Sequence, residues 1–123
     1  MLVAYLWLNA ALYLVFAIWC TFGWKQTSAA MGYVQLDASG RSEFLTVYGG
    51  LQLGLAGVFA WCASSGDTRA GLVLALGVYL AIVSFRVASM LRNRPVSRVT
   101  RAVAGLEGAL LAMALALWFG VVG

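Results

Sequence analysis

The sequence predicts an all-α integral membrane protein built as a bundle of four transmembrane helices. Of its 123 residues, 63% are hydrophobic and only 10% are charged, whereas about 25% of the residues of a soluble domain are charged. The apolar residues gather in four runs of about 20 residues, each long enough to cross ~30 Å of hydrocarbon. The short alternating strands of a membrane β-barrel do not appear in this pattern. We therefore expect one four-helix domain over residues 1–123.

The four spans are expected at residues 1–24, 43–63, 70–91 and 99–122. The first has no basic stretch before it and no small-residue cleavage site after it, so we expect it to stay in the protein as a helix. Glu43 is expected at the start of the second span, where an acidic side chain favours a helix N-terminus.

Three polar loops of unequal length separate the spans. Residues 64–69 (SSGDTR) read as a tight hairpin loop, and residues 92–98 (RNRPVSR) contain Pro95, which ends any helix that runs into it. The longest loop, 25–42, is either an ordinary loop or a short amphipathic turn at the membrane interface. The apolar residues of that turn would be Met31, Tyr33, Val34 and Leu36.

Basic residues lie mostly on one side of the predicted bundle. Loops 25–42 and 92–98, with the start of the last span, hold Lys25, Arg41, Arg92, Arg94, Arg98 and Arg101. The other side has Arg69 alone. The positive-inside rule then predicts that both loops are cytoplasmic and that both termini are periplasmic. The net charge of +4 is thus explained by topology and anionic lipid headgroups, and we expect membrane lipids rather than nucleic acid as partners.

The composition disfavours cofactor chemistry. The chain has no His, and its two cysteines, Cys20 and Cys62, are expected roughly 20 Å or more apart by helical rise, too far for a disulfide. Zinc and haem sites would lack their usual ligands. We expect no metal and no cofactor, and enzymatic activity is disfavoured because the Ser and Cys nucleophiles have no His base.

Two opposite charges stand inside apolar spans, Arg86 in the third and Glu107 in the fourth. A charge at bilayer depth costs ~2.5 to 3.5 kcal/mol on insertion scales, so it usually faces the protein interior and has a partner. Helical rise places Arg86 about 8 Å and Glu107 about 12 Å from the cytoplasmic boundary. The two side chains are therefore predicted to pair.

Polar side chains on the other spans are predicted to surround this pair, because spacings of four and seven residues put them on shared helix faces. The predicted set is Tyr48, Gln52, Tyr79, Asn9 and Tyr13. Two interpretations remain open. The set is either a structural seam that fixes helix register or a ligand or proton site.

Small residues indicate close helix packing or an oligomer interface. They lie on one face of the second span (Gly50, Gly54 and Gly57) and in a stripe on the fourth (Ala102, Gly105, Ala109, Ala112 and Ala116). At 100° per residue, Glu107 points nearly opposite that stripe. If Glu107 faces Arg86, the stripe is left for a second copy of the chain or for a partner membrane protein.

The segment EFLTVYGGLQLG, which runs from Glu43 to Gly54, together with Arg86 and Glu107, resembles the small bacterial four-helix membrane family called domain of unknown function 4345, and more distantly DoxX-type bundles. The resemblance covers nearly the whole chain. One departure is the stretch from Leu45 to Val47, where the family pattern leads us to look for another Arg. The resemblance implies four helices and an inner-membrane location, and it implies no established activity.

The sequence therefore favours a non-catalytic bundle that acts by association with itself or with a partner membrane protein. The alternative is a binder or transporter of a lipophilic small molecule, with a polar pocket around Arg86 and Glu107.

Overall fold

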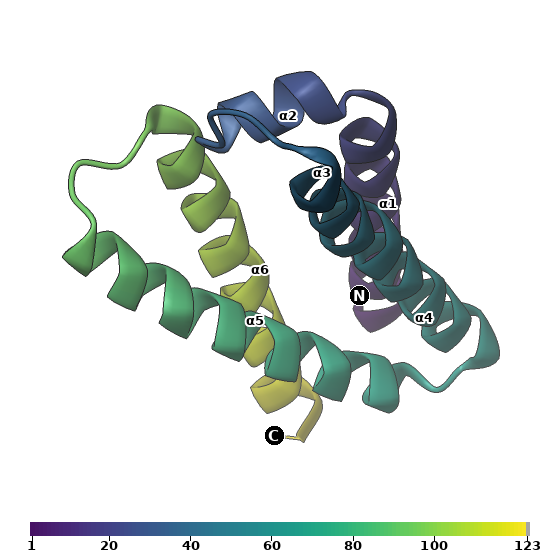
Figure 1. Ribbon diagram of the computed structural model, residues 1–123. Helices are drawn as coiled ribbons and strands as arrows, with labels where there is room; N and C mark the ends of the chain where they lie inside the picture. Colours follow the sequence, from purple (N-terminus) through teal and green to yellow (C-terminus); the bar gives the residue numbers. More distant parts are fainter. Residues whose placement is uncertain (123) are drawn as a thin grey trace. The chain divides into compact units, whose positions relative to one another are not determined.

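A computed structural model describes the backbone of residues 1–122 and the side chains of residues 1–120. The described chain is helical and contains no strand, so the predicted all-α class is confirmed (Figure 1). The elements are α1 (Leu2–Phe22), α2 (Trp24–Ala30), α3 (Ala38–Leu45), the π-helical turn η1 (Thr46–Leu51), α4 (Gln52–Ser65), α5 (Thr68–Arg92) and α6 (Arg98–Val122).

Four helical segments are long and apolar enough to cross a membrane, which makes this a multi-pass membrane protein. Their mean hydropathy lies between 1.4 and 2.1. They cover Leu2–Phe22, Ala38–Ser65, Thr68–Arg92 and Arg98–Gly120. These bounds agree with the predicted spans to within a few residues, except at the start of the second.

The second span begins earlier than predicted. Its helix starts at Ala38, and the Oδ1 atom of Asp37 accepts a hydrogen bond of 2.7 Å from the backbone N–H of Gly40. This is an N-cap, which satisfies one of the free N–H groups of a first helical turn. Glu43 therefore lies in the second turn of the helix, and the expectation that it marks the helix start is wrong. The polar residues after Asp37 extend the helix beyond its apolar part.

The loop predicted over residues 25–42 contains a short helix, α2, at Trp24–Ala30. Two buried hydroxyl side chains of α2 bond to backbone oxygens of the preceding turn, Thr27 to Gly23 at 2.8 Å and Ser28 to Lys25 at 3.2 Å. The apolar residues from Met31 onward follow α2 in a turn and then in a segment without regular secondary structure, so the helical part of this loop lies before them.

The chain divides into two compact units. One consists of Val3–Thr68, and the other contains the residues from Arg69 onward with Met1–Leu2. In the first unit, α1 packs along η1 and α4 (Figure 1). Tyr13 stacks on Phe59 with ring centroids 5.7 Å apart, and Phe16 meets Tyr48 edge-on at 6.3 Å. Leu6, Cys20, Phe59 and Cys62 are buried in this unit.

The π-helical turn η1 brings the second span close to α1 at one glycine. A Cβ atom added at Gly49 would lie 2.6 Å from the Oγ1 atom of Thr21, whereas one at Gly50 would meet nothing within 4 Å. The predicted packing face of Gly50, Gly54 and Gly57 is exposed, and an added Cβ at each meets nothing within 4 Å among the described residues. Close packing within the unit thus uses Gly49, not that face.

In the second unit, α5 and α6 form an antiparallel hairpin joined by residues 93–97. The guanidinium carbon of Arg69 lies 5.9 Å from the ring centroid of Trp118, and Arg86 bonds to Glu107. Both pairs fit an antiparallel arrangement, because the partner closer to the loop on α5 contacts the partner closer to the loop on α6. The α5 face that is buried contains Gly71, Leu72, Ala75 and Tyr79, and on α6 Leu110 and Ala114 are buried.

Candidate functional site: an intramembrane ion pair

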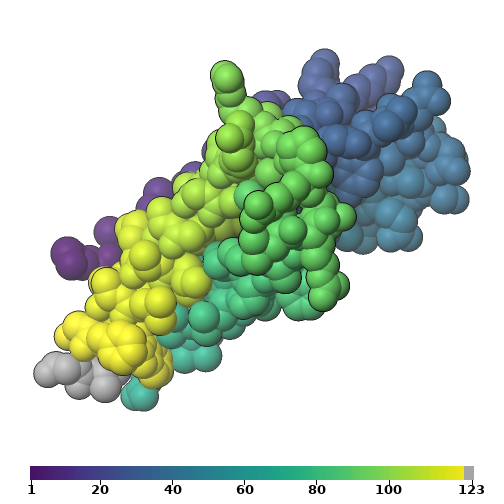
Figure 2. All heavy atoms as spheres, turned by 90° about the vertical axis from the view of Figure 1, so that its left-hand side faces the viewer, coloured from purple at the N-terminus to yellow at the C-terminus, as the bar shows by residue number. Residues whose placement is uncertain are grey.

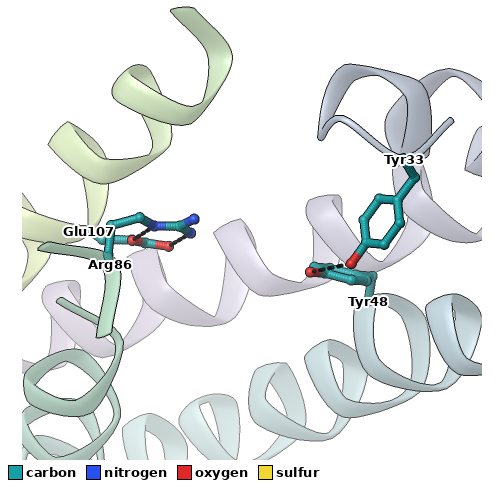
Figure 3. A network of polar contacts seen from close by, with 4 residues as sticks. All are labelled: Tyr33, Tyr48, Arg86 and Glu107. Carbon is teal, nitrogen blue, oxygen red and sulfur yellow. Dashed lines mark hydrogen bonds and ion pairs between the residues drawn. The ribbon is translucent and has the colours of Figure 1, made fainter. Parts of the chain in front are cut away.

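The α5–α6 unit contains a doubly hydrogen-bonded ion pair. Arg86 donates from Nε to Oε2 of Glu107 at 2.9 Å and from Nη2 to Oε1 at 2.7 Å (Figure 3). The planar fork of a guanidinium matches the two oxygens of a carboxylate, and such parallel bonds are among the strongest in proteins. The predicted pairing of the two charges is therefore present.

The two partners are unequally shielded. The side chain of Glu107 is 15% exposed and that of Arg86 is 33% exposed. Arg86 stands six residues before the end of α5 at Arg92, about 9 Å along the helix axis. Its long apolar stem can run along the helix while the charged group stays near the polar end. The carboxylate of Glu107 is on a shorter side chain and lies further inside its helix. It therefore depends more than Arg86 does on the ion pair for compensation of its charge.

The pair fixes which way α6 faces within its unit. Glu107 is partly buried, as are Leu111 and Trp118 on the same side of the helix, and Ala114 is fully buried. The opposite side carries the small-residue stripe, whose members are all exposed: Ala102, Gly105, Ala109, Ala112 and Ala116. Figure 2 shows α6, in yellow-green and yellow, at the surface of this unit.

The other predicted site residues have partners close to them. Asn9 is fully buried and donates its Nδ2 hydrogen to the carbonyl oxygen of Tyr5 at 2.8 Å. Tyr13 stacks on α4, and Gln52 donates to the carbonyl oxygen of Val47 at 3.4 Å. Tyr79 is buried on α5, two turns before Arg86.

Tyr48 belongs to an aromatic cluster that the sequence analysis did not foresee. Its ring lies 4.7 Å from that of Phe44, which in turn meets Tyr33 edge-on at 5.8 Å. The hydroxyl groups of Tyr33 and Tyr48 are 3.4 Å apart (Figure 3). Tyr33 comes from the loop after α2, so the cluster ties this loop to η1.

The structure therefore brings Arg86 and Glu107 together in one unit and holds Asn9, Tyr13, Tyr48 and Gln52 in the other. A single continuous polar seam through both groups stays a prediction. Among the described side chains, every buried nitrogen and oxygen atom has a hydrogen-bond partner. The buried polar side-chain atoms of each unit are thus satisfied by the chain itself.

A second feature missed from the sequence is the ring of Trp24. The Nζ atom of Lys25 lies 5.6 Å and the guanidinium carbon of Arg41 5.2 Å from its ring centroid. The sequence could have predicted the contact of Lys25 with Trp24, because the two residues are adjacent at the end of a span. It could not have predicted that of Arg41, which is distant in sequence and reaches the Trp24 ring only because the chain turns back after α2.

The described residues contain no cluster of three or more metal-ligating side chains, and Cys20 and Cys62 are free and buried. What the arrangement offers chemically is a charge pair within an apolar helix hairpin. No protein-family model matches the chain, and no curated protein and no solved structure matches it either.

Proposed function

We propose that this is a non-catalytic protein of the bacterial inner membrane that acts by association through the small-residue face of α6, with a second copy of itself or with a partner membrane helix. The observation that carries the proposal is the ion pair of Arg86 with Glu107, because it turns the opposite face of α6 outward. Alanines and glycine form the middle of that face, and the exposed side chains of Leu106 and Met113 lie at its edge. Small residues allow two helix backbones to approach closely in lipid.

The satisfied polar groups support the same proposal. Two charges that hydrogen-bond to each other in a fork have little capacity left for a proton-transfer cycle, and they serve well to fix helix orientation. The distribution of the basic residues supports, by the positive-inside rule, an inner-membrane location with periplasmic termini. A reporter fused after the last residue tests this orientation, and a cytoplasmic signal would contradict it.

The association is tested by enlarging the stripe. In the variant with Ala109→Leu and Ala112→Leu, the dissociation constant of self-association in proteoliposomes, measured by energy transfer between labelled copies, should rise about tenfold or more, which equals about 1.4 kcal/mol. The matched control is Ala81→Leu with Ala88→Leu, two exposed alanines on α5. It adds the same volume away from the stripe and should change the constant less than twofold.

A monomeric wild-type protein at all lipid dilutions would refute self-association. The same labelled wild-type and leucine variants would then be compared in affinity purification from the native membrane. Recovery of a partner membrane protein by the wild type and not by the stripe variant supports a heteromeric contact, and recovery of none refutes the proposal as a whole.

One observation favours a second candidate. The side chain of Arg86 is one-third exposed, so a lipophilic anion dissolved in the membrane can reach it and compete with Glu107. This protein would then bind or transport such a molecule. Binding of a lipophilic anion that is unchanged in a folded Glu107→Gln variant would remove this candidate.

A further inference from the structure

Two cations share one aromatic ring at the end of the first span. Lys25 and Arg41 each place their charge within 6 Å of the Trp24 ring centroid, the range of a cation–π interaction. Lys25 lies just beyond the end of α1 at Phe22, and Arg41 lies in the first turns of α3. Positive charge from two separate helices therefore gathers at a single indole.

Beside this ring is a cavity of about 730 Å³ that lies between α2, the following loop and the start of α3. It is open to the outside over much of its boundary, so it suits a group presented at the surface rather than an enclosed ligand. The lining includes the polar groups of Lys25, Ser28 and Gln35 and the rings of Trp24 and Tyr33. The cavity thus has one cationic wall and several uncharged hydrogen-bonding groups.

The walls of the cavity are held in place by contacts outside it. Tyr33 is fixed by the edge-on contact with Phe44 and by the hydroxyl of Tyr48. Asp37 also lines the cavity, and its Oδ1 atom accepts the N–H of Gly40. Asp37 stays negatively charged, and the positive end of the α3 dipole offsets part of its repulsion of an anion.

The cavity lies where two of the apolar spans end. Its residues begin two positions after the end of the first span at Phe22 and include Asp37, directly before the second span. Val34 on its rim is 97% exposed. An exposed apolar side chain beside Trp and Tyr rings is typical of the boundary between headgroups and acyl chains.

We propose that this cavity binds the phosphate group of an anionic phospholipid. Lys25 in its lining supplies positive charge, and so does Arg41, which follows the lining residue Gly40 and contacts the Trp24 ring. Trp24 holds both cations beside the cavity. The bond-forming groups are cations and hydrogen-bond donors, which match a phosphate oxygen. The inference does not depend on the association proposed for α6, because the two features belong to different units.

The test measures lipid preference at the tightest site. The protein is prepared in nanodiscs with equal phosphatidylglycerol and phosphatidylcholine, and native mass spectrometry gives the ratio of the first lipid retained. In the variant with Lys25→Gln and Arg41→Gln, the preference for phosphatidylglycerol should fall about 30-fold, at about a fivefold loss for each basic residue near an anionic surface.

The matched control is Arg92→Gln with Arg94→Gln, which removes the same charge from the other basic loop. It should change the preference less than twofold, and an equal fall in both variants would refute a defined site. Arg41→Lys keeps the charge and should keep most of the preference, so it separates loss of binding from loss of folding. If the wild-type protein binds inorganic phosphate but shows no preference for phosphatidylglycerol over phosphatidylcholine, the ligand is free phosphate and the lipid assignment is wrong.

Discussion

Replacement of the Arg86–Glu107 pair tests whether the two charges act as one unit of structure. The single variants are Arg86→Met and Glu107→Leu, and the third protein carries both changes. Removing one partner of a buried pair costs about 3 to 5 kcal/mol, because the remaining charge is left uncompensated. Removing both in favour of apolar side chains of similar volume is often close to neutral.

The exposure of the two side chains ranks the single variants. Arg86→Met leaves the carboxylate, whose side chain is only 15% exposed, so we expect a loss of about 3 kcal/mol in the free energy of unfolding. Glu107→Leu leaves the guanidinium, which is 33% exposed and can extend toward the polar end of α5. Its expected cost is smaller, about 2 kcal/mol. The double variant should lie within about 1 kcal/mol of the wild type.

Equilibrium unfolding in mixed micelles, followed by helical circular dichroism, measures all four proteins of this cycle. The coupling energy between the two sites is expected to be at least about 2 kcal/mol. If the effects of the single changes add, so that the double variant loses about 5 kcal/mol, the pair does not act as one unit. A larger cost for Glu107→Leu than for Arg86→Met would show that the ranking from exposure is wrong.

Two further predictions concern the second span, and thermal unfolding measures both. Gly49→Ala should lower the free energy of unfolding by about 1 to 3 kcal/mol, because its new methyl group overlaps Thr21. Adding Thr21→Ala to the same protein should restore most of this loss. Gly50→Ala should cause no loss, because the space around Gly50 is open. An equal loss in both glycine variants would place the effect in the backbone. Asp37→Ala removes the cap of α3 and should cost about 1 kcal/mol, whereas Asp37→Asn should keep most of the stability, and equal losses in these two would contradict a capping role.

The sequence predicted the fold class and the ion pair because both depend on strong, simple terms. A run of about 20 apolar residues has few alternatives to a membrane helix. A charge inside such a helix needs a partner. Arg86 and Glu107 lie at similar predicted depths in neighbouring spans, so each was the natural partner of the other. The outward orientation of the α6 stripe followed from the same pair, through the angle between Glu107 and Ala109.

The contacts in the unit Val3–Thr68 were harder to predict. A 3.6-residue period places Tyr48 and Gln52 on one helix face, but both lie in or beside η1, where the turns are wider. Gln52 accordingly bonds to the carbonyl five residues before it, at Val47. The hydrophobic pattern does not show a π-helical turn. The close helix contact that Gly49 makes was therefore predicted for Gly50, Gly54 and Gly57 instead. The early start of the helix was, by contrast, readable from Asp37, a favoured capping residue.

The π-helical turn also sets the phase of the whole second span. Each residue added to or removed from an α-helix rotates the rest of that helix by about 100°, and a π-turn holds one residue more than an α-turn. The wider turn of η1 therefore accommodates the extra residue locally, and α4 keeps the phase that it would have without that residue. If the same residues formed a regular α-helix instead, α4 would turn by about 100° relative to α3, and Phe59 would leave its stack on Tyr13. The π-helical geometry of η1 thus decides which side of α4 belongs to the protein and which belongs to the lipid.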